Sequence, residues 1–179
     1  MCGRSVFATN QVIENFYHVD RFGQLVEPNG VSRPGQRVPI LFGLKGQTIL
    51  TSAVWGWNPD VPEMYNARSE TVAKRFLFKG AWADAQTCIF PLTSFFEQGQ
   101  QFSGDQVLSV AGIYQTWWQD GKLYTICATM LTQPSIEPVS NVHPRMPAFV
   151  RDGNKWLHKP SLDDIHHEVL LHRLAVQAA

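Results

Sequence analysis

Two long β-rich runs separated by Asp120-Gly121 place the strongest constraint on how this chain folds. The runs cover residues 107–118 and 122–130 and are rich in Val, Ile, Thr, Tyr and Trp. An Asp-Gly pair between such runs is typical of a two-residue β-hairpin, because both residues tolerate the positive φ angles of the turn. We therefore predict a long antiparallel hairpin in the second half of the chain.

Shorter elements are expected around this hairpin. Strands are predicted at Val6-Phe7 and over residues 48–57, 87–96 and 147–151, and the Pro-, Gly- and Arg-rich residues 28–39 form a loop. Helices are predicted from Thr9 to Asp20, from Ser69 through Phe78, and from Ser161 with Leu162, Ile165 and Val169 on one side. The chain is thus expected to be a single compact α+β domain over residues 1–179, in which an antiparallel, barrel-like sheet carries peripheral helices.

Composition narrows the class of protein. The chain has 179 residues, of which 44% are hydrophobic and 17% charged, so it can bury a core and is not disordered. Its formal net charge is zero, which argues against a uniform basic coat for polyanions but leaves room for a local basic groove. We expect a soluble, cytoplasmic, nucleoid-associated protein, because neither a leader-like start nor ~18–20 consecutive apolar residues are present. We expect a monomer because the sequence shows no obvious surface for self-association.

No metal or cofactor is expected. The three cysteines, Cys2, Cys88 and Cys127, form no C-x-x-C pair, and His166 and His167 are adjacent rather than spaced along one helix face. Cys88 lies within an apolar run and is interpreted as a buried small hydrophobe.

Cys2 is the first candidate for chemistry. Removal of Met1 would expose an N-terminal cysteine, which carries a thiol and a primary amine on one residue. An α-amine with a pKa of ~7.7–8.0 is partly neutral at physiological pH and adds to aldehydes as an imine. The thiol can then close a thiazolidine ring, which an internal cysteine cannot do. The alternative is a cysteine that merely follows Met1.

Three further segments carry candidate groups. Asn66 and Arg68 could hold an amine or a sugar hydroxyl and a phosphate, or they could belong to an ordinary helix start. Glu97 ends an apolar run, where burial would raise its pKa for proton transfer, unless it points to water. His143 lies in the loop His143-Pro144-Arg145, either as an acid/base group or as a surface histidine. Arg4 and Arg145 offer two more possible phosphate contacts.

Together these segments resemble the SOS-response-associated peptidase (SRAP) family. The matching blocks occur in the family's order and span nearly the whole chain: Met1-Cys2-Gly3-Arg4, Arg33-Pro34-Gly35-Gln36, Trp55-Gly56, Asn66-Ala67-Arg68-Ser69-Glu70, Cys88-Ile89-Phe90-Pro91 leading to Phe95-Phe96-Glu97, Ala111-Gly112-Ile113-Tyr114, and His143-Pro144-Arg145-Met146-Pro147.

The resemblance implies a specific chemistry. Cys2, freed by autocatalytic or aminopeptidase removal of Met1, would form a thiazolidine with the ring-opened aldehyde of an abasic site in single-stranded DNA. Asn66 would position the Cys2 amine and the lesion, Glu97 would act as acid/base, and His143 would assist ring opening. Arg4, Arg68 and Arg145 would bind phosphates, and Trp55 and Pro34 would pack against the flanking bases.

Two other functions remain open at the level of sequence. One is a thiol peptidase with Cys2 as nucleophile and His143 as base, whose proteolysis could amount to a single self-cleavage after Met1. The other is a module that binds single-stranded DNA without catalysis.

Overall fold

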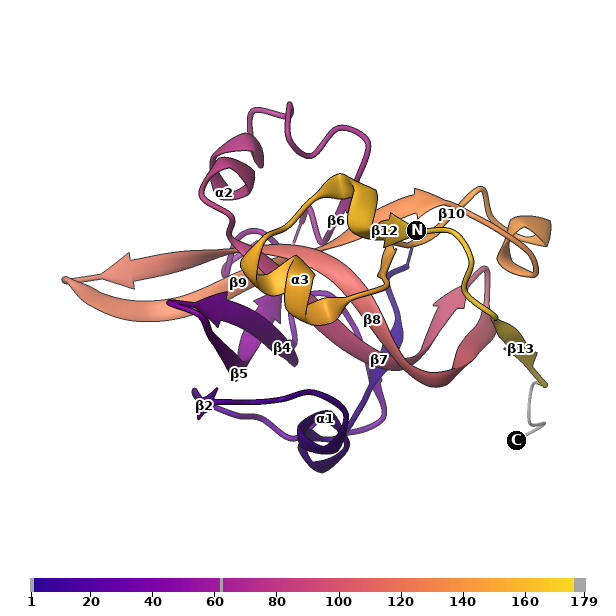
Figure 1. Ribbon diagram of the computed structural model, residues 1–179, viewed down its shortest axis with the longest axis horizontal. Helices are drawn as coiled ribbons and strands as arrows, with labels where there is room; N and C mark the ends of the chain where they lie inside the picture. Colours follow the sequence, from indigo (N-terminus) through magenta and orange to yellow (C-terminus); the bar gives the residue numbers. More distant parts are fainter. Residues whose placement is uncertain (1, 62, 176–179) are drawn as a thin grey trace.

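Five long strands pair around a closed circuit and form the body of the protein (Figure 1). In this computed structural model, which describes residues 2–61 and 63–175, β8 (Gln100–Gln119) pairs with β9 (Lys122–Pro134), and β9 with β5 (Gln47–Trp55). β5 then pairs with β4 (Arg37–Leu44), and β4 with β7 (Thr87–Glu97). β7 pairs back with β8 and closes the circuit, which confirms the predicted single α+β domain with a barrel-like sheet.

The sheet is mixed rather than purely antiparallel. β5 and β9 run parallel, with Val54 opposite Cys127, and β6 (Asn66–Arg68) also joins β9 in parallel. These pairings join strands that are far apart in the sequence, so no local sequence pattern predicts whether the strands run parallel or antiparallel. The antiparallel expectation holds for the hairpins.

The predicted β8–β9 hairpin is confirmed, with Asp120 and Gly121 at φ angles of 50° and 74°. A second two-residue turn, Gln98-Gly99, has φ angles of 48° and 77° and joins β7 to β8. This turn places Glu97 at the last position of β7, opposite Gln100.

The remaining elements are short and lie around the barrel. They are β1 (Ser5–Phe7), α1 (Asn10–Phe16), β2 (Arg21–Phe22), β3 (Val31–Ser32), α2 (Lys79–Ala83), η1 (Val139–Asn141), β10 (Arg145–Pro147), β11 (Phe149–Val150), α3 (Gly153–His158), η2 (Leu162–Asp164), β12 (Ile165–His166) and β13 (His172–Leu174).

The predicted first and second helices differ from the observed ones. α1 is capped by Thr9 as expected but ends at Phe16, because Tyr17 is extended, with φ −113° and ψ 146°. The helix predicted from Ser69 to Phe78 is wrong, since this segment consists of turns until α2 begins at Lys79. The Ser69 backbone N–H bonds the Thr132 carbonyl of β9, so this residue continues a strand pairing instead of opening a helix.

The predicted C-terminal helix is also wrong. Ser161 does cap a helix, but only the single 3-10 turn of η2. The chain then runs through the short strands β12 and β13, which pair with β11 and β8. An unpredicted helix, α3, begins after Asp152, whose side chain accepts a hydrogen bond from the Lys155 backbone N–H. The loop predicted over residues 28–39 likewise contains β3 and the start of β4.

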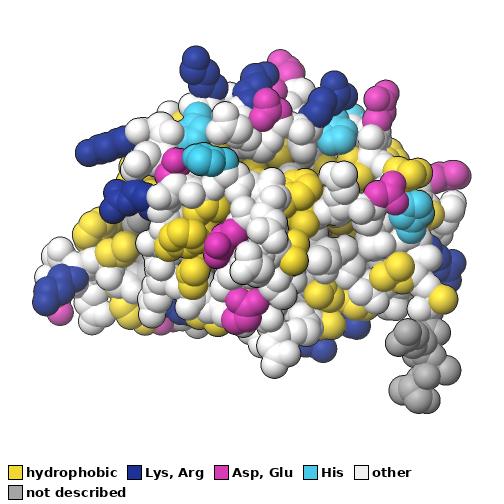
Figure 2. Space-filling view, turned by 60° about the horizontal axis from the view of Figure 1, so that its bottom comes forward, with side chains coloured by type: hydrophobic (Ala, Val, Ile, Leu, Met, Phe, Trp, Pro, Cys, Tyr) yellow, Lys and Arg dark blue, Asp and Glu magenta, His cyan; other side chains and the backbone are white. Residues whose placement is uncertain are grey.

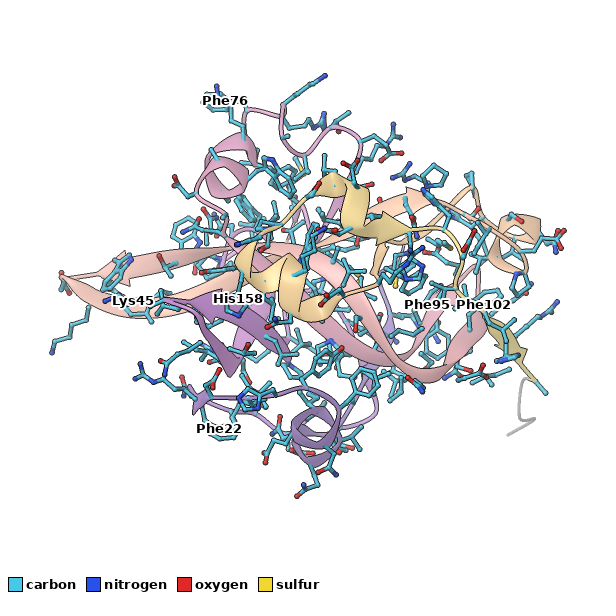
Figure 3. All side chains as sticks on the ribbon, in the orientation of Figure 1. Phe22, Lys45, Phe76, Phe95, Phe102 and His158 are labelled. Atoms are coloured by element: carbon cyan, nitrogen blue, oxygen red, sulfur yellow. The ribbon has the colours of Figure 1, made fainter. Side chains whose placement is uncertain are left out.

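Alternation along the strands divides the core into two layers. In β4, Ile40 and Phe42 face the barrel interior, whereas Leu41 packs on the outer side together with Ile13 of α1 and Trp156 of α3. The interior is rich in aromatic rings; Phe95 and Phe102, on facing strands of the β7–β8 hairpin, stack with centroids 5.6 Å apart (Figure 3). None of the helices in the described ranges is long and apolar enough to span a membrane.

Candidate active site

Cys2 lies directly before β1, with its side chain completely buried in the barrel interior. Its Sγ atom is 3.2 Å from the Ser5 Oγ and 3.6 Å from the Arg4 carbonyl oxygen. The pKa of the Cys2 thiol is raised to about 12, chiefly by burial; the Ser5 hydrogen bond lowers it and the nearby Glu97 carboxylate raises it. The thiol is therefore held protonated and shielded from water.

Asn66 reaches Cys2 from the first position of β6. Its Nδ2 donates a 2.9 Å hydrogen bond to the Cys2 carbonyl oxygen, across 64 positions of sequence. The parallel pairing of β6 with β9, with Asn66 opposite Met130, brings the two residues together. The structure therefore assigns Asn66 to a strand rather than to the helix start that the sequence left open.

Glu97 points into the protein and not to water. It is 3% exposed, at the end of β7, and its Oε2 lies 3.7 Å from the His143 Nδ1. Burial raises the pKa of the Glu97 carboxyl, while the nearby His143 acts in the opposite direction. A carboxyl with a raised pKa holds its proton more readily than an exposed one and is suited to acid/base chemistry.

His143 is held in the loop between η1 and β10. Its Nδ1 lies 2.8 Å from the Arg145 carbonyl oxygen and 3.1 Å from the Arg145 backbone nitrogen, and its own carbonyl accepts a 2.6 Å hydrogen bond from the Ser135 hydroxyl. The side chain is only 16% exposed. His143 is therefore a fixed group beside Glu97, not a loose surface histidine.

The four residues predicted to react thus meet at one place. Asn66 contacts Cys2, Glu97 acts electrostatically on the Cys2 thiol, and His143 lies beside Glu97. We call Cys2, Asn66, Glu97 and His143 the reactive cluster. A buried thiol, a carboxyl with a raised pKa and a histidine can together move protons during covalent chemistry.

The three predicted phosphate-binding arginines differ in their surroundings. The Arg4 guanidinium lies 4.4 Å from the centroid of the Phe96 ring, and Arg68 is exposed two residues after Asn66, on the same side of β6. Arg145 makes a two-point ion pair with Glu70, at 2.6 and 2.8 Å, and also bonds Thr132. Arg4 and Arg68 remain good candidates for phosphate contacts, whereas the Arg145 guanidinium already has partners within the chain.

Trp55 and Pro34, the two residues predicted to contact bases, differ in their exposure to solvent. Trp55 is completely buried and donates its Nε1 hydrogen to the Tyr65 carbonyl at 3.2 Å, so as placed it offers no face on which a base could stack. The large aromatic residue lies inside because β5 is buried along nearly its whole length. Pro34 is partly exposed in the turn before β4, and its role stays a prediction.

Two residues near Cys2 were missed at the level of sequence. Ser5 contacts the thiol, and Tyr65 lies beside Gly3, since a Cβ on Gly3 would be 3.5 Å from the Tyr65 ring. Tyr65 directly precedes Asn66, so its position in the chain was the available signal. Nothing in the sequence indicated Ser5, because its contact with the Cys2 thiol depends on how residues 2–5 fold.

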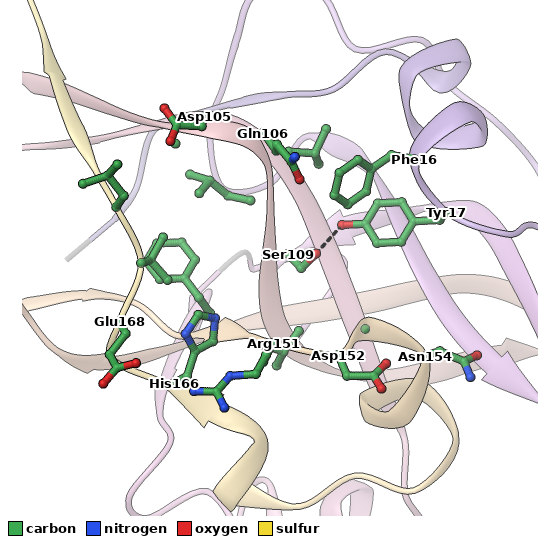
Figure 4. Close-up of a pocket in the computed structure, with 18 of the residues that line it drawn as sticks. Phe16, Tyr17, Asp105, Gln106, Ser109, Arg151, Asp152, Asn154, His166 and Glu168 are labelled. Carbon is green, nitrogen blue, oxygen red and sulfur yellow. Dashed lines mark hydrogen bonds between the residues drawn. The ribbon is translucent and has the colours of Figure 1, made fainter.

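A large surface cavity lies elsewhere. It has a volume of about 790 Å³ and is lined by residues of α1, β8 and the segment around β12, including Tyr17, Ser109 and His166, but by none of the reactive cluster (Figure 4).

On the face shown in Figure 2, Lys and Arg side chains alternate with Asp and Glu and form no continuous basic stripe. In the described ranges, no group of three His, Cys, Asp or Glu residues could hold a metal ion.

Comparison with known proteins gives a consistent result. Residues 1–178 match the family model described as SOS response associated peptidase (SRAP). The abasic site processing protein YobE of Bacillus subtilis is 27% identical, over 96% of this chain and 88% of its own length. The abasic site processing protein HMCES of Xenopus tropicalis is 23% identical, over 73% of this chain and 54% of its own length.

Solved structures share the fold. A protein from Bordetella bronchiseptica superposes with a TM-score of 0.79 at 19% identity, covering 98% of this chain and all of that one. A protein from Bacteroides thetaiotaomicron gives a TM-score of 0.75 at 16% identity, covering 98% of this chain and 93% of the other. Because the family model matches residues 1–178, this chain belongs to the SOS response associated peptidase (SRAP) family.

Proposed function

We propose that this protein processes abasic sites in single-stranded DNA by forming a covalent thiazolidine link through Cys2 after Met1 has been removed. The observation that carries the proposal is the convergence of Cys2, Asn66, Glu97 and His143 from four separate segments. Two relatives named as abasic site processing proteins, YobE and HMCES, support the choice of substrate. Met1 lies outside the described residues, so its removal rests on the chemistry that the proposal requires.

The reactive cluster suggests a role for each group. The Cys2 amine attacks the aldehyde of the opened abasic sugar and loses water to give an imine. The Asn66 amide holds the Cys2 carbonyl at 2.9 Å and so fixes the direction of the amine. Glu97 and His143 exchange the protons that sugar opening and dehydration require, since one carboxyl and one imidazole lie 3.7 Å apart at the same place.

In this proposal, binding of single-stranded DNA depends on a small number of arginine side chains. Arg4 and Arg68 flank the reactive cluster, and neither has a carboxylate ion pair among the described residues. Phe96 and Tyr65, both partly exposed, provide aromatic surface close to the same arginines. A single strand would therefore be held by a small number of phosphate contacts with stacking, independent of base sequence.

The burial of the thiol argues against the peptidase alternative. A cysteine peptidase attacks with a thiolate, and such thiolates form where the thiol pKa is depressed. Here burial raises the Cys2 pKa to about 12. An imine formed first by the amine does not need a thiolate at the outset, so aldehyde chemistry fits this site better than turnover of added peptides.

The decisive experiment is a denaturing gel after incubation with a single-stranded oligonucleotide that carries one abasic site. Wild type should give a heat-stable, slowly migrating band, and Cys2→Ala should give none. Cys2→Ala and Cys2→Ser both keep the α-amine and can form an unstable imine, whose weak strand cleavage should be most visible with Cys2→Ser. A Cys2→Ala variant that cross-links as well as wild type would contradict the proposal.

Intact-mass measurement of each sample shows whether Met1 is gone, so that an absent band is interpretable. If wild type without Met1 gives no band but cleaves an added peptide, and a thiol alkylator stops that cleavage, the peptidase function takes precedence. Equal affinity for intact and abasic strands without any adduct would indicate a simple binding module.

A further inference from the structure

The Ser5 hydroxyl is in hydrogen-bond contact with the sulfur of Cys2. Ser5 Oγ lies 3.2 Å from Cys2 Sγ, and both residues are completely buried. Water is therefore excluded from this contact, and a hydrogen bond made here replaces the solvation that an exposed sulfur would receive.

The position of this hydroxyl is set by the sheet. β1 lies between two strands, with Ser5 opposite Ser32 of β3 and opposite Phe95 of β7. The preceding Arg4 carbonyl accepts a 3.0 Å hydrogen bond from the Phe96 backbone N–H, which anchors the segment between Cys2 and β1. The hydroxyl and the thiol are thus held together by backbone pairing on both sides.

The hydrogen bonds also have a consistent direction. The Cys2 thiol donates to the Arg4 carbonyl oxygen at 3.6 Å. The thiol hydrogen is then directed away from Ser5, and the Ser5 hydroxyl can donate to the sulfur. This second bond persists when the thiol loses its proton, and it becomes stronger because the acceptor is then charged.

We propose that Ser5 is a positioning residue for ring closure, whose hydroxyl orients the Cys2 sulfur and stabilises its developing negative charge as the thiazolidine forms. This inference rests on the proposed function and names the group that assists its second step. Ser5 touches neither the DNA nor the imine carbon; it acts through the sulfur.

The step balances without any further reagent. The imine already joins the Cys2 nitrogen to the former aldehyde carbon. The sulfur forms a bond to that carbon, the C=N π pair moves to nitrogen, and the proton that leaves sulfur ends on nitrogen, with Glu97 able to relay it. In agreement with this role, the Ser5 hydrogen bond lowers the thiol pKa against the larger effect of burial.

The test separates the two chemical steps. Sodium cyanoborohydride traps the imine, whereas the heat-stable cross-link reports the closed ring. For Ser5→Ala we expect imine trapping at the wild-type rate, ring closure slowed about tenfold at neutral pH, and a pH–rate profile shifted to higher pH, because a hydrogen bond to a charged group is lost. Ser5→Thr keeps the hydroxyl and should restore much of the rate.

Ser94→Ala is the matched control. Ser94 is also a buried serine beside β1, opposite Val6, but its hydroxyl accepts a hydrogen bond from the Gln101 side chain. It should close the ring at the wild-type rate. The inference is overturned if Ser5→Ala closes the ring as fast as wild type, if it slows imine formation equally, or if Ser94→Ala has the same effect.

Failure of the proposed function would be distinguishable. If wild-type protein without Met1 does not cross-link to abasic DNA, the same variants can be treated with formaldehyde, which forms a thiazolidine with an N-terminal cysteine. The imine and the ring have the same mass, so each sample is quenched with sodium cyanoborohydride, which adds two hydrogens to the imine and none to the ring. Intact mass then follows ring closure with no DNA present. Slower closure in Ser5→Ala supports the role of Ser5 even so, and equal closure rates in all variants reject it.

Discussion

At the residue scale, Glu97 combines a structural cost with a chemical use. Its carboxyl is buried at the end of β7, which raises its pKa above the ordinary 4.5. His143, 3.7 Å away, acts in the opposite direction and offsets part of the cost of burying the charge. A carboxyl with a raised pKa is protonated over a wider acidic range. Folding therefore favours its neutral form, and the stability that the neutral carboxyl contributes is lost as pH rises through the folded-state pKa.

Glu97→Gln should separate these two effects. We expect cross-linking to fall by about 100-fold or more, because the acid/base group is gone. The acidic limb of the wild-type pH–rate profile should disappear in the variant. Thermal unfolding at pH 8 should show a melting temperature at least equal to that of wild type, since a buried charge has been removed. Wild-type kinetics in the variant, or an acidic limb that persists unchanged, would assign proton transfer to another residue.

At the element scale, the two-point ion pair between Arg145 and Glu70 ties β10 to the turn after β6. Arg145 also bonds Thr132 of β9, so three neighbouring segments are fastened beside His143. The Arg145 guanidinium holds the pKa of the Glu70 carboxyl at about 2. This arrangement suggests that Arg145 supports the loop that carries His143, in addition to or in place of binding a phosphate.

Glu70→Gln should therefore destabilise the protein in a pH-dependent way. Because the Glu70 pKa is depressed, the contribution of its ionised form is fully present above pH 4.5 and is lost as pH falls toward about 2. We expect a loss of about 1 kcal/mol at pH 7, reduced by the partial exposure of Glu70. Urea unfolding at several pH values measures it, with exposed Glu63→Gln as control. An equal loss at pH 7 and pH 2 would contradict the ion-pair explanation.

At the scale of the whole molecule, the formal net charge is zero, so the proposed binding of DNA depends on a few local arginines and not on a general positive charge. Each phosphate contact to a single strand contributes about −0.7 to the slope of log K against log salt. We expect a shallow slope of about −2 for intact single strands, set by Arg4, Arg68 and few other groups.

Arg68→Ala should make this slope less steep by about 0.7, with affinity lowered similarly for all base sequences. Fluorescence anisotropy of a labelled oligonucleotide at increasing salt measures both quantities. Lys45→Ala, at an exposed turn between β4 and β5, is the control and should leave the slope unchanged. A slope unaffected by Arg68→Ala would place the strand on another surface.

The sequence by itself determined the elements whose causes are local, and it predicted which residues react. The Asp120-Gly121 turn, the strand predicted over residues 87–96 and the Thr9 cap of α1 follow from residue types over a few positions, and the ordered motifs indicated Cys2, Asn66, Glu97 and His143.

Tertiary structure decided what depends on contacts between distant segments. It bonded the Ser69 backbone to β9 instead of placing this residue in a helix, paired the segment after Ser161 with the sheet, and buried Trp55, which the motifs had suggested for base stacking. It also put Ser5 against the Cys2 sulfur and Glu70 against Arg145. The physical reason is the same in each case: burial and hydrogen bonding across the closed barrel outweigh local propensities, which amount to less than ~1 kcal/mol per residue.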